Sequence, residues 1–464
     1  MEIEYIDDEY LEHLRFSVKE IDCTEDKPPP VDFDDVIYTN EQGRMFVNYS
    51  TFAHNIIDHL NLISYRGLFF NTDGEVTTES IRQLIAEILN DHGWTGKFDS
   101  VINSLISTVR DLSNHEDFKA DKNTLYFLNG ELDITSDDEW VFYKGRKTHT
   151  PYRLNCNFIE NYTQKGLDKF GQWLSDLFEK PDRQTVQEML GCCLVPVNKV
   201  QEAFILVGGA GSGKSVLTHL LYEIFGKAYV AVNLTELDEN RFILANIENK
   251  LVVYDDDLQT RALTDTGEFK KLITSEQPIK AERKGQQPYM FTPYATVIAN
   301  TNQMVQALYD DSAGFFRRLH PIVVKEKDEN RRDIFNMNEL VAAEKDHICA
   351  WAVQGLWELR HKRYKIHWSD SSREFLEAEK NPLKNFFDNV FEITGDEEDR
   401  VSQAEIIKLY KRWCREEISS MAMSDQRVAK WLHNHSATLG ITKIRMGAKR
   451  VLGFKGLKVR EAWR

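Results

Sequence analysis

The stretch Gly208-Gly209-Ala210-Gly211-Ser212-Gly213-Lys214-Ser215 decides the fold of this chain. It fits the pattern G-x-x-x-x-G-K-[ST], in which glycines let backbone N–H groups close around phosphate oxygens. An apolar run of strand length precedes it at 203–207, and apolar residues at helical spacing follow over 216–225. This strand–loop–helix frame predicts a nucleotide site, with Lys214 on the β- and γ-phosphates and the Ser215 hydroxyl on Mg²⁺.

The composition is that of an ordinary globular protein. The chain has 464 residues, of which 42% are hydrophobic and 28% charged. Apolar runs stay below the ~18 residues of a membrane span, and the acidic N-terminus does not resemble a signal peptide, so we expect a cytoplasmic protein without membrane contact. The six cysteines are scattered, which fits a reducing compartment. Adjacent Cys192 and Cys193 lie in an apolar stretch and are expected to pack in the core.

Charge is distributed unevenly along the chain. The formal net charge of -16 argues against a general nucleic-acid coat protein. Residues 1–35 hold 13 acidic side chains against three basic ones, whereas residues 403–464 hold 14 Lys and Arg against five Asp and Glu. Contact with nucleic acid is therefore expected at the basic C-terminal end.

Periodicity and composition divide the chain into six segments around an α/β nucleotide core. We expect an acidic N-terminal segment (1–50), an α+β domain (51–165), a helical linker (166–199), the nucleotide core (200–325), a helical region (326–384) and a basic winged-helix domain (385–464).

An acidic strand end supplies the second half of a nucleotide site. The apolar run 251–254 is followed by Asp255, Asp256 and Asp257. One carboxylate beside a phosphate loop holds the Mg²⁺ shell, and a neighbour polarises the attacking water. We assign the metal role to Asp255 and the base role to Asp256, with Asp257 pointing away. The alternative is an acidic turn at the end of a strand.

A third apolar run, 295–299, ends in Asn300-Thr301-Asn302. A polar amide at the tip of a core strand orients the lytic water or senses the γ-phosphate. Asn302 is the preferred candidate and Asn300 the second, while a simple turn asparagine is the alternative.

Between the acidic strand and this one, residues 278–289 read as a hairpin with a basic tip. Lys280, Arg283 and Lys284 would grip a phosphate backbone there, unless the hairpin is only a solvated charged turn. Further along, Arg317 and Arg318 precede the apolar run 319–324. Arg318 is the better candidate for an arginine finger that reaches the nucleotide of a neighbouring subunit; the alternative is a pair of surface charges.

The basic C-terminal end resembles a winged helix. Ser424 caps an expected helix over 425–432, and a hairpin follows with a cationic outer face. Such a module contacts duplex phosphates or a groove. A solvated basic face or a partner-docking domain is the alternative. The candidate DNA contacts of the hairpin are Lys443, Arg445, Lys449 and Arg450.

The order of these parts resembles the superfamily 3 helicases of the AAA+ class, in particular phage and plasmid replicative helicases and the helicase half of phage primase-helicases. GGAGSGKS, KAERKG, VIANTN and FFRRL carry the resemblance over roughly residues 200–325. It implies a P-loop NTPase core, a parallel sheet with flanking helices, in a ring that is a hexamer. The ring would use ATP and Mg²⁺ to move 3′ to 5′ along one strand of single-stranded or forked DNA.

The resemblance also implies roles for individual residues. Lys214, Ser215, Asp255, Asp256 and Asn302 would act in cis and Arg318 in trans. The three basic residues of the central hairpin would line the channel. Many relatives have Asn where Ser212 stands, and many have Glu in the acidic strand where this chain has Asp.

Two other classes of function compete with a mobile-element helicase. The first is an AAA+ initiator or remodelling ATPase that binds DNA without processive unwinding, and the second is a DNA-binding protein that holds nucleotide only as a structural ligand. The chain shows no primase constellation, so a separate primase, polymerase or initiator protein is an expected partner.

Overall fold

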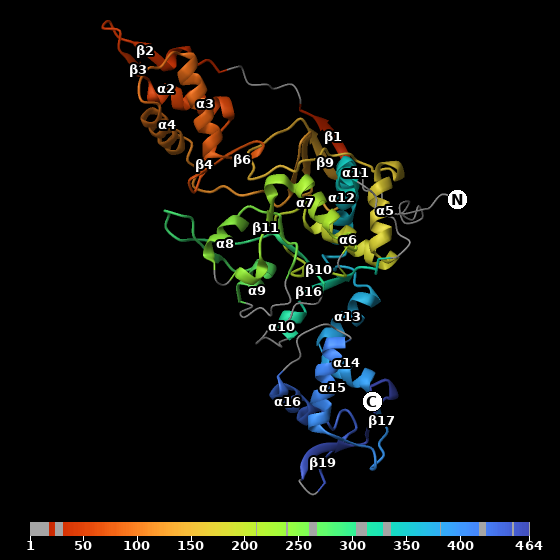
Figure 1. Ribbon diagram of the computed structural model, residues 1–464. Coiled ribbons are helices and arrows are strands. Elements are labelled where there is room, and N and C mark those ends of the chain that lie inside the picture. The colour runs from red at the N-terminus through yellow and green to blue at the C-terminus, as the bar shows by residue number, and fades with distance from the viewer. Residues whose placement is uncertain are drawn as a thin grey trace. The chain divides into compact units, whose positions relative to one another are not determined.

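The computed structural model divides into two compact units, Met1–Ser369 and Asp370–Arg464 (Figure 1). The second unit begins ahead of the boundary near 385 that composition suggested. The residues that the structure describes are 18–23, 31–209, 211–237, 240–258, 267–302, 313–327, 336–380, 382–416, 424–447 and 450–463. Within these ranges, no helix combines the length and the apolar character needed to cross a bilayer.

A five-stranded parallel sheet forms the centre of the first unit, so the predicted α/β class with a parallel sheet is confirmed. Its strands lie in the order β11-β12-β15-β10-β16. Because the sheet is covered on both faces, strands such as β10 are continuously apolar and wholly buried. The strands are β10 (Ala203–Val207), β11 (Tyr229–Ala231), β12 (Val252–Asp255), β15 (Thr296–Thr301) and β16 (Leu319–Val323).

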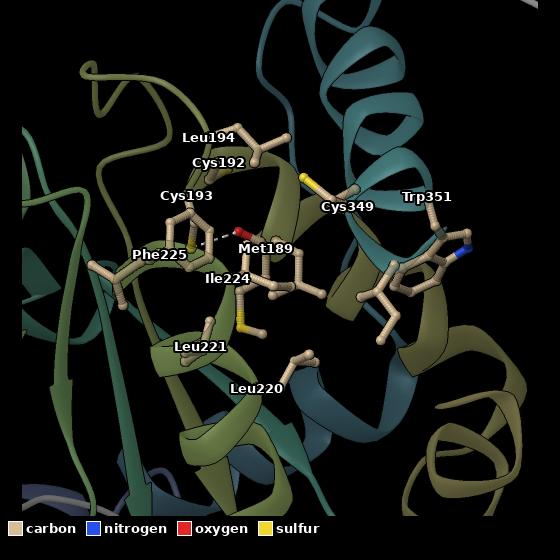
Figure 2. Packing of buried hydrophobic residues seen from close by; sticks show 14 of the residues in the cluster. Met189, Cys192, Cys193, Leu194, Leu220, Leu221, Ile224, Phe225, Cys349 and Trp351 are labelled. Atoms are coloured by element: carbon tan, nitrogen blue, oxygen red, sulfur yellow. Dashed lines mark hydrogen bonds between the residues drawn. The ribbon is translucent and has the colours of Figure 1, made fainter. Parts of the chain in front are cut away.

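Helix α7 (Ser215–Phe225) follows β10 and packs its apolar stripe inward, as the spacing predicts. It ends at Gly226, whose φ of 46° permits the left-handed turn there. Figure 2 shows α7 side chains meeting Met189, Cys192 and Cys193 from the α6 region (Lys180–Cys192), with Cys349 and Trp351 from α12 (Lys345–His361) close by.

The prediction that the paired cysteines belong to the core is confirmed. Cys192 and Cys193 are buried free thiols, and burial raises the pKa of both. The Cys193 thiol donates to the carbonyl of Met189 at 3.2 Å. These thiols act as small apolar groups that fit α6 against its neighbours.

Two smaller assemblies precede the central sheet in sequence. Amphipathic helices α2 (Tyr49–Leu60), α3 (Thr78–Asp91) and α4 (Phe98–Leu112) enclose one core. The apolar stripes of α3 and α4 are buried apart from Leu84, which is only partly so. The strands of this part are β2 (Ile37–Thr39), β3 (Met45–Val47), β4 (Ile63–Tyr65), β5 (Leu68–Asn71) and β6 (Gly74–Val76). A second sheet joins β1 (Val18–Asp22), β9 (Trp140–Lys144), β8 (Gly130–Asp133) and β7 (Thr124–Phe127).

The predicted hairpin lies in the connection between β12 and β15, which are neighbours in the sheet. It consists of β13 (Ile279–Ala281) and β14 (Tyr289–Phe291), which pair antiparallel. The other helices of the unit are α5 (Asp168–Leu177), α8 (Arg241–Ile247), α9 (Gly267–Thr274), α10 (Ala313–Phe316) and α11 (Met337–Ala343).

The second unit builds its own aromatic core. Ser424 accepts from the Arg427 amide and caps α16 (Asp425–His435), as expected. The predicted hairpin follows as β19 (Thr442–Met446) and β20 (Val451–Lys455), and β18 (Arg400–Ser402) completes the sheet. The remaining elements are α13 (Asp370–Lys380), α14 (Pro382–Val390), α15 (Gln403–Glu416), β17 (Phe391–Ile393) and β21 (Leu457–Val459).

Candidate nucleotide site and basic hairpin

The glycine-rich loop joins β10 to α7 at the carboxyl edge of the sheet. Gly211 and Gly213 have φ of 74° and 104°, which L side chains rarely adopt. At Gly208 the limit is space, because a Cβ there would lie 2.7 Å from the Cβ of Val324. Ala210 lies outside the described residues. The backbone angles at Gly211 and Gly213 and the lack of space at Gly208 explain why glycine occupies these three positions.

Lys214 folds back over the loop that it ends. Its Nζ donates to the carbonyls of Gly208 at 2.6 Å and Gly209 at 2.9 Å, and to the Ser212 hydroxyl at 3.2 Å. Partial burial lowers the pKa of the Lys214 ammonium, and the charge of Asp256 opposes that shift. Ser215 is exposed at the first residue of α7.

The loop has a support that its own sequence does not reveal. Trp173 on α5 donates from Nε1 to the carbonyl of Gly213 at 3.0 Å. The indole is otherwise buried among apolar side chains. Helix α5 thus fixes the end of the loop just before Lys214.

The two candidate carboxylates after β12 have different environments. The carboxylate of Asp255 is 6% exposed and accepts two backbone amides, from Leu234 at 2.8 Å and Asp257 at 3.2 Å. Burial raises the pKa of this carboxyl, and the two amides oppose the rise. Asp255 thus connects β12 to the turn at Leu234.

Asp256, by contrast, is exposed and turned toward α7 and β15. Its Oδ1 accepts from the Thr218 hydroxyl at 2.9 Å and from Asn300 Nδ2 at 3.2 Å. The Tyr254 hydroxyl lies 3.5 Å from the same oxygen. These contacts hold one carboxylate oxygen in place on the side of the sheet that carries the phosphate loop.

The structure places the two candidate asparagines differently. Asn300 is buried within β15 and reaches Asp256, whereas Asn302 is exposed one residue beyond the strand. The Oδ1 atom of Asn300 is buried and has no hydrogen-bond partner among the described residues. Of the two, Asn300 is the residue that the fold brings to the carboxylate.

The arginines before β16 lie at the far side of β10. Arg317 is exposed and Arg318 is partly buried. The Arg318 carbonyl accepts from the Ala203 amide at 2.7 Å, which fixes its backbone at the start of β16.

The central hairpin presents its basic residues unequally. Lys280 and Lys284 are exposed. Arg283 is not, because its guanidinium pairs with Glu248 and lies over the ring of Tyr289, 4.9 Å from the centroid. Lys280 and Lys284 are therefore the hairpin cations open to a ligand.

In the second unit, Lys443, Arg445 and Arg450 are exposed on or beside the β19–β20 hairpin. Along β19, Lys443 and Arg445 alternate with the half-buried Ile444 and Met446, so these two cations share one face. Lys449 lies outside the described residues.

Comparison with known proteins adds little on function. A profile described as a family of unknown function, DUF5906, matches residues 206–318. No curated protein matches the chain. Similar solved structures include "The A form apo structure of NrS-1 C terminal region-CTR", which is 14% identical with a TM-score of 0.47 and covers 85% of this chain and 94% of its own. "The apo structure of NrS-1 C terminal region (305-718)" is also 14% identical, with a TM-score of 0.46 and coverage of 82% and 84%. Likeness at this level carries no conclusion about activity.

Sequence reasoning missed three residues of this region. Thr218 lies one helical turn beyond Lys214, so the two residues share a face of α7. This spacing could have indicated that Thr218 lies near the site. Trp173 and Glu248 gave no signal, because each reaches its partner through tertiary contacts alone.

Proposed function

We propose that this protein is an ATP-dependent DNA helicase of the AAA+ superfamily 3 type that serves replication of a mobile genetic element. The observation that supports this most is that the start of α7, which carries Lys214, and the Asp256 carboxylate, 2.9 Å from the Thr218 hydroxyl of α7, both lie at the carboxyl edge of one parallel sheet. Along the chain, the basic hairpin lies in the connection between β12 and β15, two neighbouring strands of that sheet. A candidate DNA grip is thus joined directly to strands that carry the candidate nucleotide site.

ATP with Mg²⁺ fits the residues at this edge. The loop offers backbone amides and the Lys214 ammonium to phosphate oxygens, and the start of α7 adds positive potential. Ser215 and Asp256 supply hard oxygen donors, which Mg²⁺ prefers. The bound nucleotide would supply the transferred phosphoryl group, while the protein supplies position and charge.

The contacts favour roles for Asp255 and Asp256 that differ from those expected from the sequence. Asp255, whose two oxygens accept backbone amides, shapes the strand end. Asp256, held by Thr218 and Asn300, takes the role toward metal and attacking water. Asn300 orients that carboxylate, and Asn302 stays a candidate for direct contact with the γ-phosphate.

DNA would be gripped at two places. Lys280 and Lys284 are compact cations suited to a phosphate backbone that slides past, and sequence-independent contacts of this kind suit translocation. The cationic face around Lys443, Arg445 and Arg450 forms a second contact in a winged-helix unit. In a hexameric ring, Arg318 would complete the site of the adjacent subunit.

ATP-dependent displacement of a labelled strand from a forked duplex tests the proposal. We expect displacement by the wild type with a 3′ tail on the loading strand and none by Lys214→Ala. The Lys214→Ala substitution removes the phosphate-binding ammonium and leaves the exposed DNA cations in place. DNA-stimulated phosphate release without displacement would favour the initiator or remodelling ATPase, and no phosphate release at all would overturn both.

A further inference from the structure

Glu248, directly after α8, is the centre of a buried polar cluster at the base of the hairpin. Its side chain is 7% exposed, and it accepts from Arg66 Nη1 at 2.9 Å and from the Tyr289 hydroxyl at 2.8 Å. The guanidinium of Arg283 forms a third contact with its Oε2. Two segments far apart in sequence, the β4–β5 turn and the β13–β14 hairpin, thus converge on one carboxylate.

The rings of two tyrosines order the two guanidinium groups. Arg66 lies over Tyr65 and Tyr289, at 5.1 Å and 5.2 Å from the centroids, and Arg283 also lies over Tyr289, at 4.9 Å. Arg283 Nη1 also approaches the carbonyl of Arg66 at 3.4 Å. Stacking on an aromatic ring restricts the orientation of a guanidinium, and the Arg283–Glu248 contact is largely buried, whereas the Arg66 side chain is 36% exposed.

The backbone at Arg66 indicates that this side chain is needed. Arg66 and Gly67 form the two-residue turn between β4 and β5, with φ of 50° and 78°. Such turns favour Asn-Gly, and a residue with a long side chain costs about 1 kcal/mol in the left-handed region. An arginine here accepts that strain, and its guanidinium reaches Glu248, 182 residues away.

We propose that Arg66 and Glu248 are positioning residues for the DNA grip. The turn of the N-terminal part holds the hairpin against the end of α8 through Glu248, Arg283 and Tyr289. This leaves Lys280 and Lys284 presented to the strand in a fixed geometry. The inference rests on the proposed function and adds a regulatory contact to it, because a shift of the β4–β5 turn would change the position of the hairpin.

DNA-stimulated phosphate release by the full chain tests this. Arg66→Ala should leave basal hydrolysis unchanged and raise the DNA concentration for half-maximal stimulation by about fivefold, the effect of losing one partly exposed, stacked ion pair. Arg44→Ala is the matched control, because Arg44 is also an exposed arginine over an aromatic ring, Phe46, in the same part of the chain. It should behave as wild type.

A double-mutant cycle separates positioning from general loosening. If Arg66 acts through the hairpin, Arg66→Ala should have less than about a twofold effect once Lys284→Ala has removed the grip. Should Arg66→Ala fail to fold, Glu248→Gln, which keeps the shape and removes the charge, takes its place in the cycle. Additive effects, or normal stimulation of Arg66→Ala beside a stimulated wild type, would overturn this inference alone. A wild type that DNA does not stimulate would overturn the proposed function with it.

Discussion

Replacing Asn300 by alanine should slow ATP hydrolysis, because it frees the Asp256 carboxylate from one of its two close donors. Asn300 Nδ2 donates to Asp256 Oδ1 at 3.2 Å. Hydrogen bonds to charged groups contribute about 1.5–3 kcal/mol, and this length suggests the lower half of that range. Since each 1.36 kcal/mol is tenfold in rate, kcat should fall about 10- to 30-fold.

The same substitution should also cost some stability, because it removes the hydrogen bond to Asp256 and leaves a small space. Asn300 is 2% exposed, and its Oδ1 has no hydrogen-bond partner among the described residues. Alanine removes this buried acceptor, which offsets part of that cost. The unfolding free energy should therefore fall by about 1–2 kcal/mol, which leaves the protein folded at assay temperature and keeps an effect on catalysis distinct from one on folding.

Steady-state phosphate release measures kcat, and titration of a fluorescent ATP analogue measures nucleotide affinity. Affinity for the analogue should stay within about threefold, so that the loss appears in kcat. Asn302→Ala is the comparison variant, because Asn302 is the other candidate asparagine, exposed and two residues away, and its loss should lower kcat less. Wild-type kcat in Asn300→Ala, or a larger loss in Asn302→Ala, would refute the reasoning from geometry and favour direct contact by Asn302.

Three further substitutions test the surroundings of the site. Thr218→Val keeps the side-chain shape but removes the donor 2.9 Å from Asp256, so phosphate release should slow about tenfold and Thr218→Ser should restore it. Gly208→Ala brings a Cβ to 2.7 Å from the Cβ of Val324. It should lower the unfolding free energy by about 1–3 kcal/mol, which thermal unfolding would detect as a lower melting temperature. A second change, Val324→Ala, should recover part of this loss, and no recovery would reject the clash. Burial raises the pKa of Asp255 above its ordinary 3.8, so the folded state keeps that proton to higher pH and the group's stabilisation fades as pH rises from about 4. The melting temperature of wild type minus that of Asp255→Asn should accordingly fall over this range, and a constant difference would contradict it.

Local patterns in the sequence predicted local structure well. The β10–loop–α7 unit, the β13–β14 hairpin and the Ser424 cap each depend on residues within one short segment. Glycine at positive φ, a capping hydroxyl and an apolar stripe act over a few residues, so their meaning does not depend on the rest of the fold.

The arrangement of side chains within the site was harder to predict. Asp255 and Asp256 are adjacent, so a single residue of register decides which one faces α7. The sequence makes Asn300 the second candidate, because its pattern does not show that β15 extends through Asn300 to Thr301, from where the Asn300 amide reaches Asp256. The Arg66–Glu248 pair joins residues 182 positions apart, and no pattern along the chain encodes such a contact.

One continuous segment links the hairpin to the nucleotide site. Tyr289 of β14 bonds to Glu248, residues 292–295 lead onward, and β15 then carries Asn300 to Asp256. The link is stiff, because the ring of Pro293 fixes φ and both Pro293 and Ala295 are buried. If DNA bound at the hairpin shifts β14 and β15, the shift would reach Asn300 and through it Asp256. Because coupling between two sites is reciprocal, a nucleotide that reorients Asp256 would then change DNA affinity by the same factor by which DNA changes nucleotide affinity.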